Sequence, residues 1–503
     1  MARVVVVSDM LRGFLEEGYP LYCGIEARSI IPNIQKLLER ELKQGSKIFY
    51  LCDHHTPDDP EFKMFPPHCI EGTTEAELIP ELLQYPGGIV PKRTFSSFYN
   101  TPLDRRLKAI KPETIVVCGV TTHICVLQAV IDARNRGYEV EVPVDCVASF
   151  DKRAHPFALD YMERVLGARL IKPSVKVSPP RFEIPDSWLN GETADVYFPR
   201  TVEILKKEGI NPVATMEVFP RRAGTFCGIE EVKALLAEVL PKDNCEVWAL
   251  SQGEPFDKKE VVLRIKAPYQ SYGTYETAYL GILSHCSGWA TAARECVDAA
   301  QGIPVISFGA RHVHPSVVGI MEYSAIVGGC TGCASTAGAK LAGTIPHALI
   351  IILGSTAKAS IAFDKHMPPE VPRIALVDTF EDEVRESVTV AKALRRKLQG
   401  VRLDTPSERG RVTADLVKEV RAWLDLEGFK DVKIVASGGL DPERIRYFID
   451  EGAPVDIFAV GSYISDAKPI DFTADLHEVK GKPIAKRGRM PGITPNPRLK
   501  RVM

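Results

Sequence analysis

The sequence has no apolar run long enough to cross a bilayer. Its longest apolar stretches are short, such as residues 348–353, whereas a membrane-spanning helix needs roughly 20 apolar residues. The first ten residues, MARVVVVSDM, include an acid at Asp9 and lack the apolar length of a signal peptide. Twelve cysteines among 503 residues are too sparse for a disulfide scaffold. We therefore expect a reduced, cytoplasmic protein with no membrane partner.

The sequence also lacks a strong charge of either sign and a P-loop. A formal net charge of -2 gives no electrostatic reason to expect a nucleic acid partner. The pattern GxxxxGK[ST] does not occur, so Walker-type nucleotide binding is not supported. Neither an internal repeat nor a low-complexity tract is present. Hydrophobic residues at 45% and charged residues at 25% are ordinary for a globular protein, and the length indicates about three domains.

Strand-like and helical patterns alternate through the first 170 residues. The strand candidates are residues 3–8, 47–52, 88–91, 114–118 and 139–144. Helical patterns lie between them, for example over 29–43 and 124–136. Such alternation predicts an α/β fold with a doubly wound parallel sheet and helices on both faces.

The later part of the chain predicts further domains. Residues 171–192 contain four prolines and no clear period, as expected of a linker. Residues 193–300 mix helices and strands, and a βα rhythm returns after about residue 304. Its strand candidates are residues 305–308, 373–377, 401–403, 433–436 and 457–460. The sequence thus predicts a closed or partly closed barrel over 301–465, and a tail, 466–503, packed on the domain 193–300.

Three residues able to perform amide chemistry follow three predicted strands. Asp9 ends RVVVVSD, Lys92 ends GIVPK, and Cys125 lies in CGVTTHIC. Ligands of open α/β sheets bind beyond the carboxyl ends of the strands, so we expect these side chains to converge. A helix start and a nearby ammonium favour a thiolate at Cys125, and the Asp9 carboxylate could take the thiol proton. Taken singly, each residue could be only a core cysteine or a solvated lysine.

The stretch CDHHTPDDPEFKMFPPHC concentrates imidazole and carboxylate groups. It holds Asp53, His54, His55, Glu61 and His68. Such ligands without thiolate suit Zn²⁺, Mn²⁺ or Fe²⁺ with open positions for a substrate. The alternative is a polar loop, and Asp58 and Asp59 are interpreted as turn residues. We predict a divalent metal site here.

The motifs VSDM, DHH…HC.EGT, PKRTFSSF and CGVTTHICV make the first 170 residues resemble a nicotinamidase of the isochorismatase-like cysteine hydrolases. The resemblance implies an Asp–Lys–Cys triad at Asp9, Lys92 and Cys125. It also implies a cis peptide at Val120–Thr121 and an oxyanion hole formed by the backbone N–H groups of Thr121 and Cys125. The metal ligands that the resemblance implies are Asp53, His55, Glu61 and His68. In the family this metal holds the pyridine nitrogen of nicotinamide.

Glycine-containing turns end two of the later predicted strands. SGGLD begins at residue 437 and VGS at residue 460, and backbone N–H groups in such turns bind phosphate. Alone they are weak signals, since glycine after a strand is also a plain turn. Arg402 and Asp404 alternate along one predicted strand and so share a face. They suit a phosphorylated sugar with Mg²⁺, or else a buried ion pair that closes a barrel layer.

The motifs TADVYFPR, SYGTYET, SFGARH, GTIPHA, VRLDT, SGGLD and VGSY make residues 193 to about 490 similar to a nicotinate phosphoribosyltransferase. The resemblance implies an α/β sandwich domain, an irregular TIM-like barrel, and a homodimer or higher oligomer that shares sites between subunits. It also implies roles for individual residues. The substrate-binding residues are Tyr197 from a second subunit, Phe308, Arg311, Arg402, Asp404, Gly439, Gly461 and Ser462. It further makes His347 the histidine that ATP phosphorylates.

Together the two resemblances imply a bifunctional enzyme of NAD salvage that binds nicotinamide, nicotinate, phosphoribosyl pyrophosphate, ATP and Mg²⁺. Three alternatives stay open at this point. The first domain could use another amide, the second could ribosylate nicotinamide itself, or one half could bind pyridines without turnover. An Asp beside the substrate's carboxyl group would favour the amide, whereas Ser335 and Thr336 favour a carboxylate.

Overall fold

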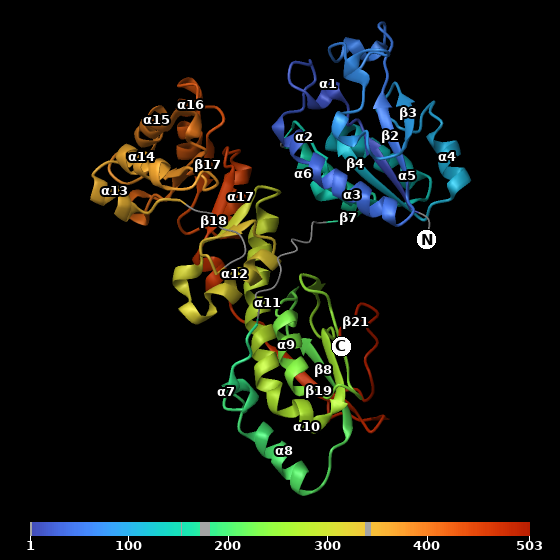
Figure 1. Ribbon diagram of the computed structural model, residues 1–503, viewed down its shortest axis with the longest axis vertical. Coiled ribbons are helices and arrows are strands. Elements are labelled where there is room, and N and C mark those ends of the chain that lie inside the picture. Colours follow the sequence, from blue (N-terminus) through green and yellow to red (C-terminus); the bar gives the residue numbers. More distant parts are fainter. Residues whose placement is uncertain (1–2, 152, 172–181, 338–343) are drawn as a thin grey trace. The chain divides into compact units, whose positions relative to one another are not determined.

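The computed structural model describes residues 3–151, 153–171, 182–337 and 344–503. Contacts between residues divide the chain into two compact units, 1–173 and 174–503. Figure 1 shows both as mixed assemblies of helices and strands. The finer partition predicted from the sequence, with boundaries at 192, 300 and 465, stays a prediction.

The first unit is built on a seven-stranded parallel sheet. Its strand order is β3-β2-β1-β4-β5-β7, with the short β6 beside the end of β4. The strands are β1 (Arg3–Ser8), β2 (Lys47–Asp53), β3 (Gly88–Lys92), β4 (Thr114–Val120), β5 (Glu139–Pro143), β6 (Val147–Ala148) and β7 (Arg169–Ile171). The helices are α1 (Arg12–Leu15), α2 (Ile25–Ser29), α3 (Ile31–Lys43), α4 (Leu103–Ile110), α5 (Leu127–Asn135) and α6 (Ala154–Arg164).

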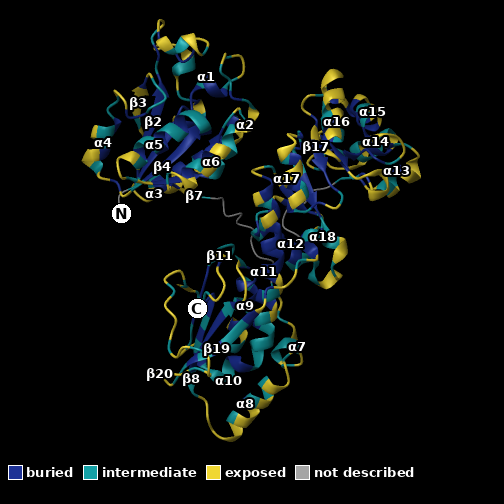
Figure 2. Cartoon of the chain, turned by 180° about the vertical axis from the view of Figure 1, so that it is seen from behind, coloured by how far each residue is buried: buried dark blue, intermediate teal, exposed yellow. Residues whose placement is uncertain are grey.

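Both faces of this sheet are buried. Alternate valines of β1 belong to different core clusters, Val5 and Val7 with α3, and Val4 and Val6 with α4 and α5. A strand covered on both faces is apolar at every position, which explains the run VVVV. Figure 2 shows β2 and β4 as buried strands between helices whose outer sides are exposed. This arrangement confirms the predicted doubly wound sheet.

The second unit begins with an antiparallel sheet of order β20-β19-β8-β12-β10-β21. The strands of this region are β8 (Val213–Pro220), β9 (Gly224–Thr225), β10 (Glu246–Ala249), β11 (Pro255–Phe256), β12 (Leu263–Pro268), β19 (Phe472–Val479), β20 (Lys482–Pro483) and β21 (Lys500–Arg501). Its helices are α7 (Asp186–Leu189), α8 (Tyr197–Lys207), α9 (Ile229–Val239), α10 (Tyr269–Tyr272) and α11 (Glu276–Ala299). Two C-terminal strands, β19 and β21, pair with β8 and β10 of this sheet.

The predicted linker, 171–192, is partly folded. Residues 172–181 of it lie outside the described residues. The rest contains α7, whose Trp188 packs against the core of the antiparallel sheet. The end of the expected linker therefore belongs to the second unit, because a large, partly buried aromatic ring packs there on the core of that unit.

The remaining strands form a parallel half-barrel of order β14-β13-β18-β17-β16-β15. The strands are β13 (Val305–Ser307), β14 (Gly332–Cys333), β15 (Ile374–Leu376), β16 (Gly400–Leu403), β17 (Lys433–Ala436) and β18 (Ile457–Val460). The helices are α12 (Val318–Val327), α13 (His347–Leu353), α14 (Thr356–His366), α15 (Glu383–Leu394), α16 (Ala414–Leu426), α17 (Pro442–Asp450) and α18 (Ser462–Ser465). The parallel strands with intervening helices confirm the irregular, barrel-like fold.

Helix α11 joins the two parts of the second unit. Tyr279 and Leu283, in its first half, pack into the core of the antiparallel sheet, whereas Ala293 and Cys296 pack into the core of the half-barrel. Among the described residues, no single helix has the length and composition of a membrane span. The pair α13 and α14, bent by 107°, reaches that length and composition only when both helices are counted together.

Candidate functional sites

Three strands of the first sheet bring three ionisable side chains to one point. Asp9 directly follows β1, Lys92 is the last residue of β3, and Cys125 lies in the turn after β4. The Lys92 Nζ is 3.0 Å from an Asp9 carboxylate oxygen and 3.6 Å from the Cys125 Sγ. All three residues are buried. The structure thus brings together the predicted triad at the carboxyl ends of parallel strands.

The turn that carries Cys125 has an unusual backbone. Residues Thr122–Val126 form a π-helical turn, and α5 begins only at Leu127, so the helix predicted over 124–136 is divided. Such turns are rare and frequent at functional sites. Gly119, just before the turn, has φ +111°, and a Cβ there would lie 2.1 Å from the Ser8 carbonyl oxygen. The peptide bond Val120–Thr121 is cis, as predicted.

Burial determines which of these groups holds a proton. It raises the pKa of the Cys125 thiol well above its ordinary value, and the Lys92 ammonium offsets this only in part. Burial, together with the Asp53 carboxylate, raises the pKa of Asp9 to about 6. Burial thus opposes the thiolate that the sequence analysis expected, whereas the ammonium favours it. Asp9, with an oxygen within 4.8 Å of the Sγ, is placed to accept the thiol proton.

Asp53 connects the triad to the histidines. It is ion-paired with Lys92 through Oδ1, and its Oδ2 lies 3.9 Å from the His55 Nε2. Burial alone would raise the pKa of Asp53, but the Lys92 and His55 charges lower it to about 2. Burial would likewise lower the pKa of Lys92, yet the two carboxylates raise it well above its ordinary value. Asp53 and Lys92 are thus both charged in a buried site.

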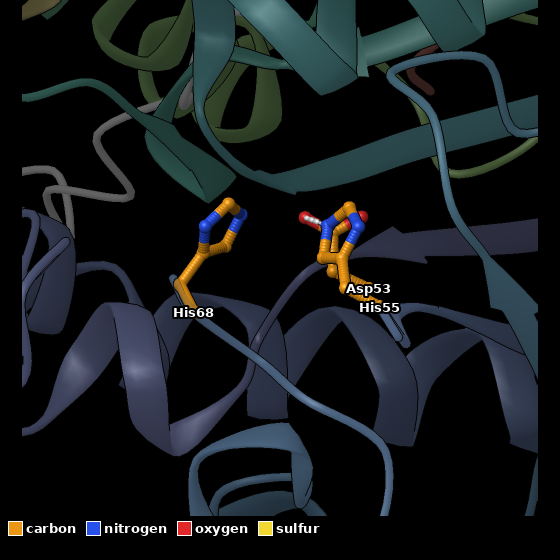
Figure 3. Close-up of side chains that lie close together, drawn as sticks. All are labelled: Asp53, His55 and His68. Atoms are coloured by element: carbon orange, nitrogen blue, oxygen red, sulfur yellow. Dashed lines mark ion pairs between the residues drawn. The ribbon is translucent and has the colours of Figure 1, made fainter. Parts of the chain in front are cut away.

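The predicted metal ligands lie beside the triad. Asp53, His55 and His68 each offer a ligand atom, and these atoms lie within 4.8 Å of one another. A backbone bridge between His55 and Ile70 places His68 beside His55. Figure 3 shows His68 opposite Asp53 and His55, with all three side chains directed into the same space. The carboxylate and two imidazoles are ligands that suit Zn²⁺ and similar ions.

The buried polar atoms of this group fit a metal. His55 is fully buried, and neither of its ring nitrogens has a hydrogen-bond partner among the described residues. Burial would lower the pKa of His55, but Asp53 and Asp59 raise it to about 9. A buried ring nitrogen of this kind is costly without a partner, so a cation held there would satisfy it.

Glu61 and His54 take different positions. Glu61 lines the cavity, with Oε1 3.8 Å from the His68 Nε2, but it is not part of the three-ligand group. His54 does not line the cavity, and its carbonyl oxygen accepts from the Arg93 side chain. Asp59, interpreted from sequence as a turn residue, instead lies 3.0 Å from the His55 Nδ1 through Oδ2.

The cavity has the size and lining of a site for a small aromatic ligand. It holds about 260 Å³, and its floor includes Asp9, Cys125, Thr121 and Asp53. Its walls include the aromatic side chains of Phe14, Tyr22, Phe65, Phe95 and Phe150. An apolar pocket with a few convergent polar groups is the usual form of a small-molecule site. The volume suits a single ring with a polar substituent.

In the half-barrel, Arg402 lies close to both Asp404 and Phe308. The Arg402 Nη1 lies 3.5 Å from the Asp404 Oδ2, and its guanidinium lies 5.6 Å from the centre of the Phe308 ring. The Arg402 Nε is buried and has no hydrogen-bond partner among the described residues. Burial lowers the pKa of Arg402, opposed by Asp404 and Asp378. A buried cation with a free N–H is a candidate ligand for an anion.

His347 has a partner that the sequence analysis missed. Its Nε2 lies 3.1 Å from the Oδ1 of Asp378, a buried residue that follows β15. Burial and the Asp404 charge raise the pKa of Asp378, against His347 and Arg402. Asp378 stands two residues after its strand, whereas Asp404 comes directly after β16. Both aspartates thus lie near the carboxyl ends of their strands, and the rule that ligands bind at strand ends could have identified Asp378 as well.

The glycine turns lie at a second cavity, of about 610 Å³. Gly439 and Ser462 line it together with Arg411 and Lys468, two cations that the sequence analysis did not select. A Cβ on Gly439 would lie 3.1 Å from the Arg411 Nη1, so glycine leaves room for that side chain. A Cβ on Gly461 would lie 3.4 Å from the His312 Nε2. Backbone N–H groups and cations at this place suit a phosphate.

Three further predicted residues lie in different surroundings. Ser335 donates its hydroxyl proton to the buried Glu322, which also accepts from the Ser335 N–H. Its proton is thus engaged within the fold rather than free for a substrate carboxylate. Arg311 is exposed in a short turn after β13. Tyr197 is 59% exposed at the start of α8, and its proposed partner site on another subunit stays a prediction.

Comparison with known proteins agrees with this division of the chain. The isochorismatase domain family matches residues 3–172. The N-terminal and C-terminal domains of quinolinate phosphoribosyl transferase match residues 195–287 and 289–475. The chain thus carries an isochorismatase domain at its N-terminus, followed by the two domains of the phosphoribosyl transferase family. Its isochorismatase unit carries the cysteine site, and its phosphoribosyl transferase unit carries the half-barrel site.

Individual relatives support the same assignment. The isochorismatase family protein PncA of Bacillus subtilis is 29% identical over 34% of the chain and 99% of its own length. Nicotinate phosphoribosyltransferase pncB2 of Mycobacterium tuberculosis is 30% identical over 46% of the chain and 51% of its own length. The phosphoribosyl transferase unit therefore spans about half the length of this relative.

A solved structure extends the comparison to three dimensions. The nicotinate-nucleotide pyrophosphorylase from Pyrococcus furiosus is 45% identical, covers 62% of this chain and 82% of its own, and has a TM-score of 0.57. The likeness supports the fold of the phosphoribosyl transferase unit.

Proposed function

We propose that the chain is a bifunctional enzyme of NAD salvage. The isochorismatase unit hydrolyses nicotinamide to nicotinate and ammonia. The phosphoribosyl transferase unit then joins nicotinate to phosphoribosyl pyrophosphate, giving nicotinate mononucleotide and pyrophosphate. The observation that carries the proposal is a cavity lined by Asp9, Cys125, Asp53 and His68, with Lys92 and His55 both paired with Asp53 beside it.

The first reaction follows from the protonation states of the cavity floor. Asp9 accepts the Cys125 thiol proton as the sulfur attacks the carboxamide carbon, since burial raises the pKa of that thiol. The backbone N–H groups of Thr121 and Cys125 stabilise the negative oxygen that forms. Asp9 then returns the proton to the leaving nitrogen, and ammonia departs. Water attacks the resulting thioester, Asp9 takes its proton, and nicotinate and the thiol are released.

Lys92 and the metal ligands have separate tasks. Lys92 stays charged between two carboxylates and keeps its ammonium 3.6 Å from the sulfur, where it stabilises developing thiolate. Asp53, His55 and His68 would hold a divalent cation, with Glu61 beside them. Such a cation would supply a Lewis-acid contact for the pyridine nitrogen and so orient the ring.

The second reaction uses the strand ends of the half-barrel. Arg402 and Phe308 receive the nicotinate ring and carboxylate, and the Gly439 and Ser462 turns receive the 5′-phosphate. Among the described residues, this unit contains no group of three His, Cys, Asp or Glu ligands. Mg²⁺ would therefore be bound chiefly through the substrate's own phosphates, as is usual for this ion. ATP would phosphorylate His347, which the Asp378 carboxylate orients.

Product analysis with ring-labelled nicotinamide tests both reactions in one experiment. With phosphoribosyl pyrophosphate, Mg²⁺ and ATP, the whole chain should convert the label first to nicotinate and then to its mononucleotide. Cys125→Ala should lower ammonia release at least about 10³-fold while supplied nicotinate is still ribosylated. Cys146→Ala, a buried cysteine outside the cavity, serves as the control.

Three results would contradict the proposal. Label that passes directly into nicotinamide mononucleotide would favour nicotinamide as the base of the second unit. Release of ammonia only from other amides would assign the first unit a different substrate. Loss of both activities in a folded Cys125→Ala variant would show that the two chemistries are not separate.

A further inference from the structure

The loop between β2 and β3 contains two neighbouring aspartates with opposite environments. Asp58 is exposed, whereas Asp59 is only 8% exposed. Each oxygen of the Asp59 carboxylate has its own partner. Oδ2 lies 3.0 Å from the His55 Nδ1, and Oδ1 accepts a hydrogen bond of 3.0 Å from the Glu61 N–H. One buried carboxylate thus contacts two of the four predicted metal-site residues.

The contact with His55 bears on which ring nitrogen can bind a cation. The His55 backbone is fixed by its bridge to Ile70, so the ring has little freedom. Neither ring nitrogen has the geometry of a hydrogen bond among the described residues, but Nδ1 lies 3.0 Å from the Asp59 Oδ2 and Nε2 lies 3.9 Å from the Asp53 Oδ2. A neutral imidazole carries its proton on one nitrogen and offers a lone pair on the other. A carboxylate at Nδ1 keeps the proton there and leaves the Nε2 lone pair for a metal.

The contact with Glu61 bears on the shape of the same site. Asp59 is the N-cap of a single 3₁₀ turn, Pro60–Lys63, which carries Glu61. Capping satisfies an N–H group at the start of the turn and fixes its direction. Glu61 is thereby held 3.8 Å from the His68 Nε2. Removing the cap would free the turn to shift Glu61 relative to the histidines.

We propose that Asp59 is the positioning residue of the metal centre. It holds His55 with the Nε2 lone pair directed at the cation and, through the cap, holds Glu61 beside His68. This inference rests on the metal site of the proposed function. Asp59 itself does not contact the substrate cavity.

Two substitutions separate the contributions of Asp59. Asp59→Asn keeps an oxygen for the Glu61 N–H but turns an amide NH₂ toward His55, which favours a proton on Nε2 instead of Nδ1. Asp59→Ser preserves a good N-cap and removes the contact with His55. Asp58→Asn removes the same charge from the exposed neighbour and is the matched control.

The readout is binding of the metal alone to the full-length chain. Zn²⁺ affinity is measured by competition with a chromophoric chelator, and the Co²⁺ absorption spectrum reports ligand geometry. We expect Zn²⁺ to bind about 10–100-fold more weakly to Asp59→Asn and Asp59→Ser, with an altered Co²⁺ spectrum. Asp58→Asn should match the parent protein. The thermal stability of the metal-free variants shows whether each is folded.

Histidine NMR of the zinc-loaded parent chain tests the assignment of nitrogens directly. The inference requires that His55 Nδ1 carries a proton and that Nε2 binds zinc. Zinc on Nδ1, or unchanged affinity and spectrum in both Asp59 variants, would overturn it. A parent chain that binds no zinc, or binds it as well after Asp53→Ala, would overturn the metal centre itself and this inference with it.

Discussion

At the scale of single residues, burial decides what an ionisable group does in this protein. Asp58 and Asp59 are identical in chemistry and adjacent in sequence, yet only the buried Asp59 contacts metal-site residues. Likewise burial raises the pKa of the Cys125 thiol well above its ordinary value, although an ammonium lies 3.6 Å away. His347 also depends on a buried group, because Asp378, its ionic partner among the described residues, is buried.

His347→Ala should retain slow ribosylation of nicotinate but lose its stimulation by ATP. The reason is that Arg402, Asp404 and the glycine turns still hold the sugar phosphate when the phosphate-accepting imidazole is removed. Nicotinate kinetics with and without ATP, and mass spectrometry of the ATP-treated chain, measure this. His366→Ala, at the exposed end of α14, is the control. Undiminished ATP stimulation and no phosphohistidine in the parent chain would leave His347 a structural residue.

At the scale of elements, two short segments set the geometry of the first site. Near the end of strand β4, the backbone of Gly119 lies very close to the backbone of β1. The π-helical turn that follows contains Cys125. The close approach of the backbones leaves no room for a side chain at Gly119. The position of Cys125 therefore depends on Gly119, which has no reactive side chain.

Gly119→Ala should destabilise the isochorismatase unit by about 2–4 kcal/mol, from the combined cost of a positive φ and of overpacking. Gly137→Ala measures the cost of the positive φ alone. Gly137 also has positive φ, at +81°, but a Cβ there would meet nothing within 4 Å. This control should lose only about 1 kcal/mol. Denaturant unfolding of both variants measures the difference, and equal losses would show that the contact with Ser8 is unimportant.

Helix α9 contains a buried acid, Glu231, which should make the stability of the phosphoribosyl transferase unit depend on pH. Burial raises its pKa from 4.5 to about 7. Between these values the unfolded chain has lost the proton that the folded chain retains, so stability falls as pH rises from about 4.5 to about 7. Glu231→Gln should remove this loss and stabilise the unit at pH 8 by roughly 1–3 kcal/mol.

Chemical unfolding of the Glu231→Gln variant at pH 5 and pH 8 measures this effect. Glu230→Gln is the comparison, since Glu230 is ion-paired with Lys233 at 2.7 Å. A gain from Glu231→Gln that is equal at both pH values would contradict the assignment to the buried carboxyl group.

At the scale of the whole molecule, each unit has its own core. Two buried clusters consist only of residues from 1–173, and three consist only of residues from 174–503. Separate cores are the physical basis for separate folding units and separate chemistries. The families matched by the two units divide the chain at the same place.

Calorimetry of the full chain should therefore show two unfolding transitions. Gly119→Ala should lower only one of them, and phosphoribosyl pyrophosphate should raise only the other, because a ligand stabilises the unit that binds it. A single transition with equal calorimetric and van't Hoff enthalpies would contradict the independence of the two units.

Much of this protein was determined by its sequence alone. The βα alternation predicted the parallel sheets, because strands buried on both faces are apolar throughout and helices between them are amphipathic. Asp9, Lys92 and Cys125 were found because each follows a strand, and strand ends of a parallel sheet meet at one edge. The loop from Asp53 to His68 was found because its ligand residues are close together in sequence.

Other features were decided only by the tertiary structure. Desolvation depends on what covers a side chain, so the raised pKa of the Cys125 thiol and the role of Asp59 could not be derived from spacing. The engagement of Ser335 by Glu322 and of His347 by Asp378 joins residues 13 and 31 positions apart. A strand-end position can point to a single residue such as Asp378, but its contact with a residue of another element exists only because packing brings the two elements together.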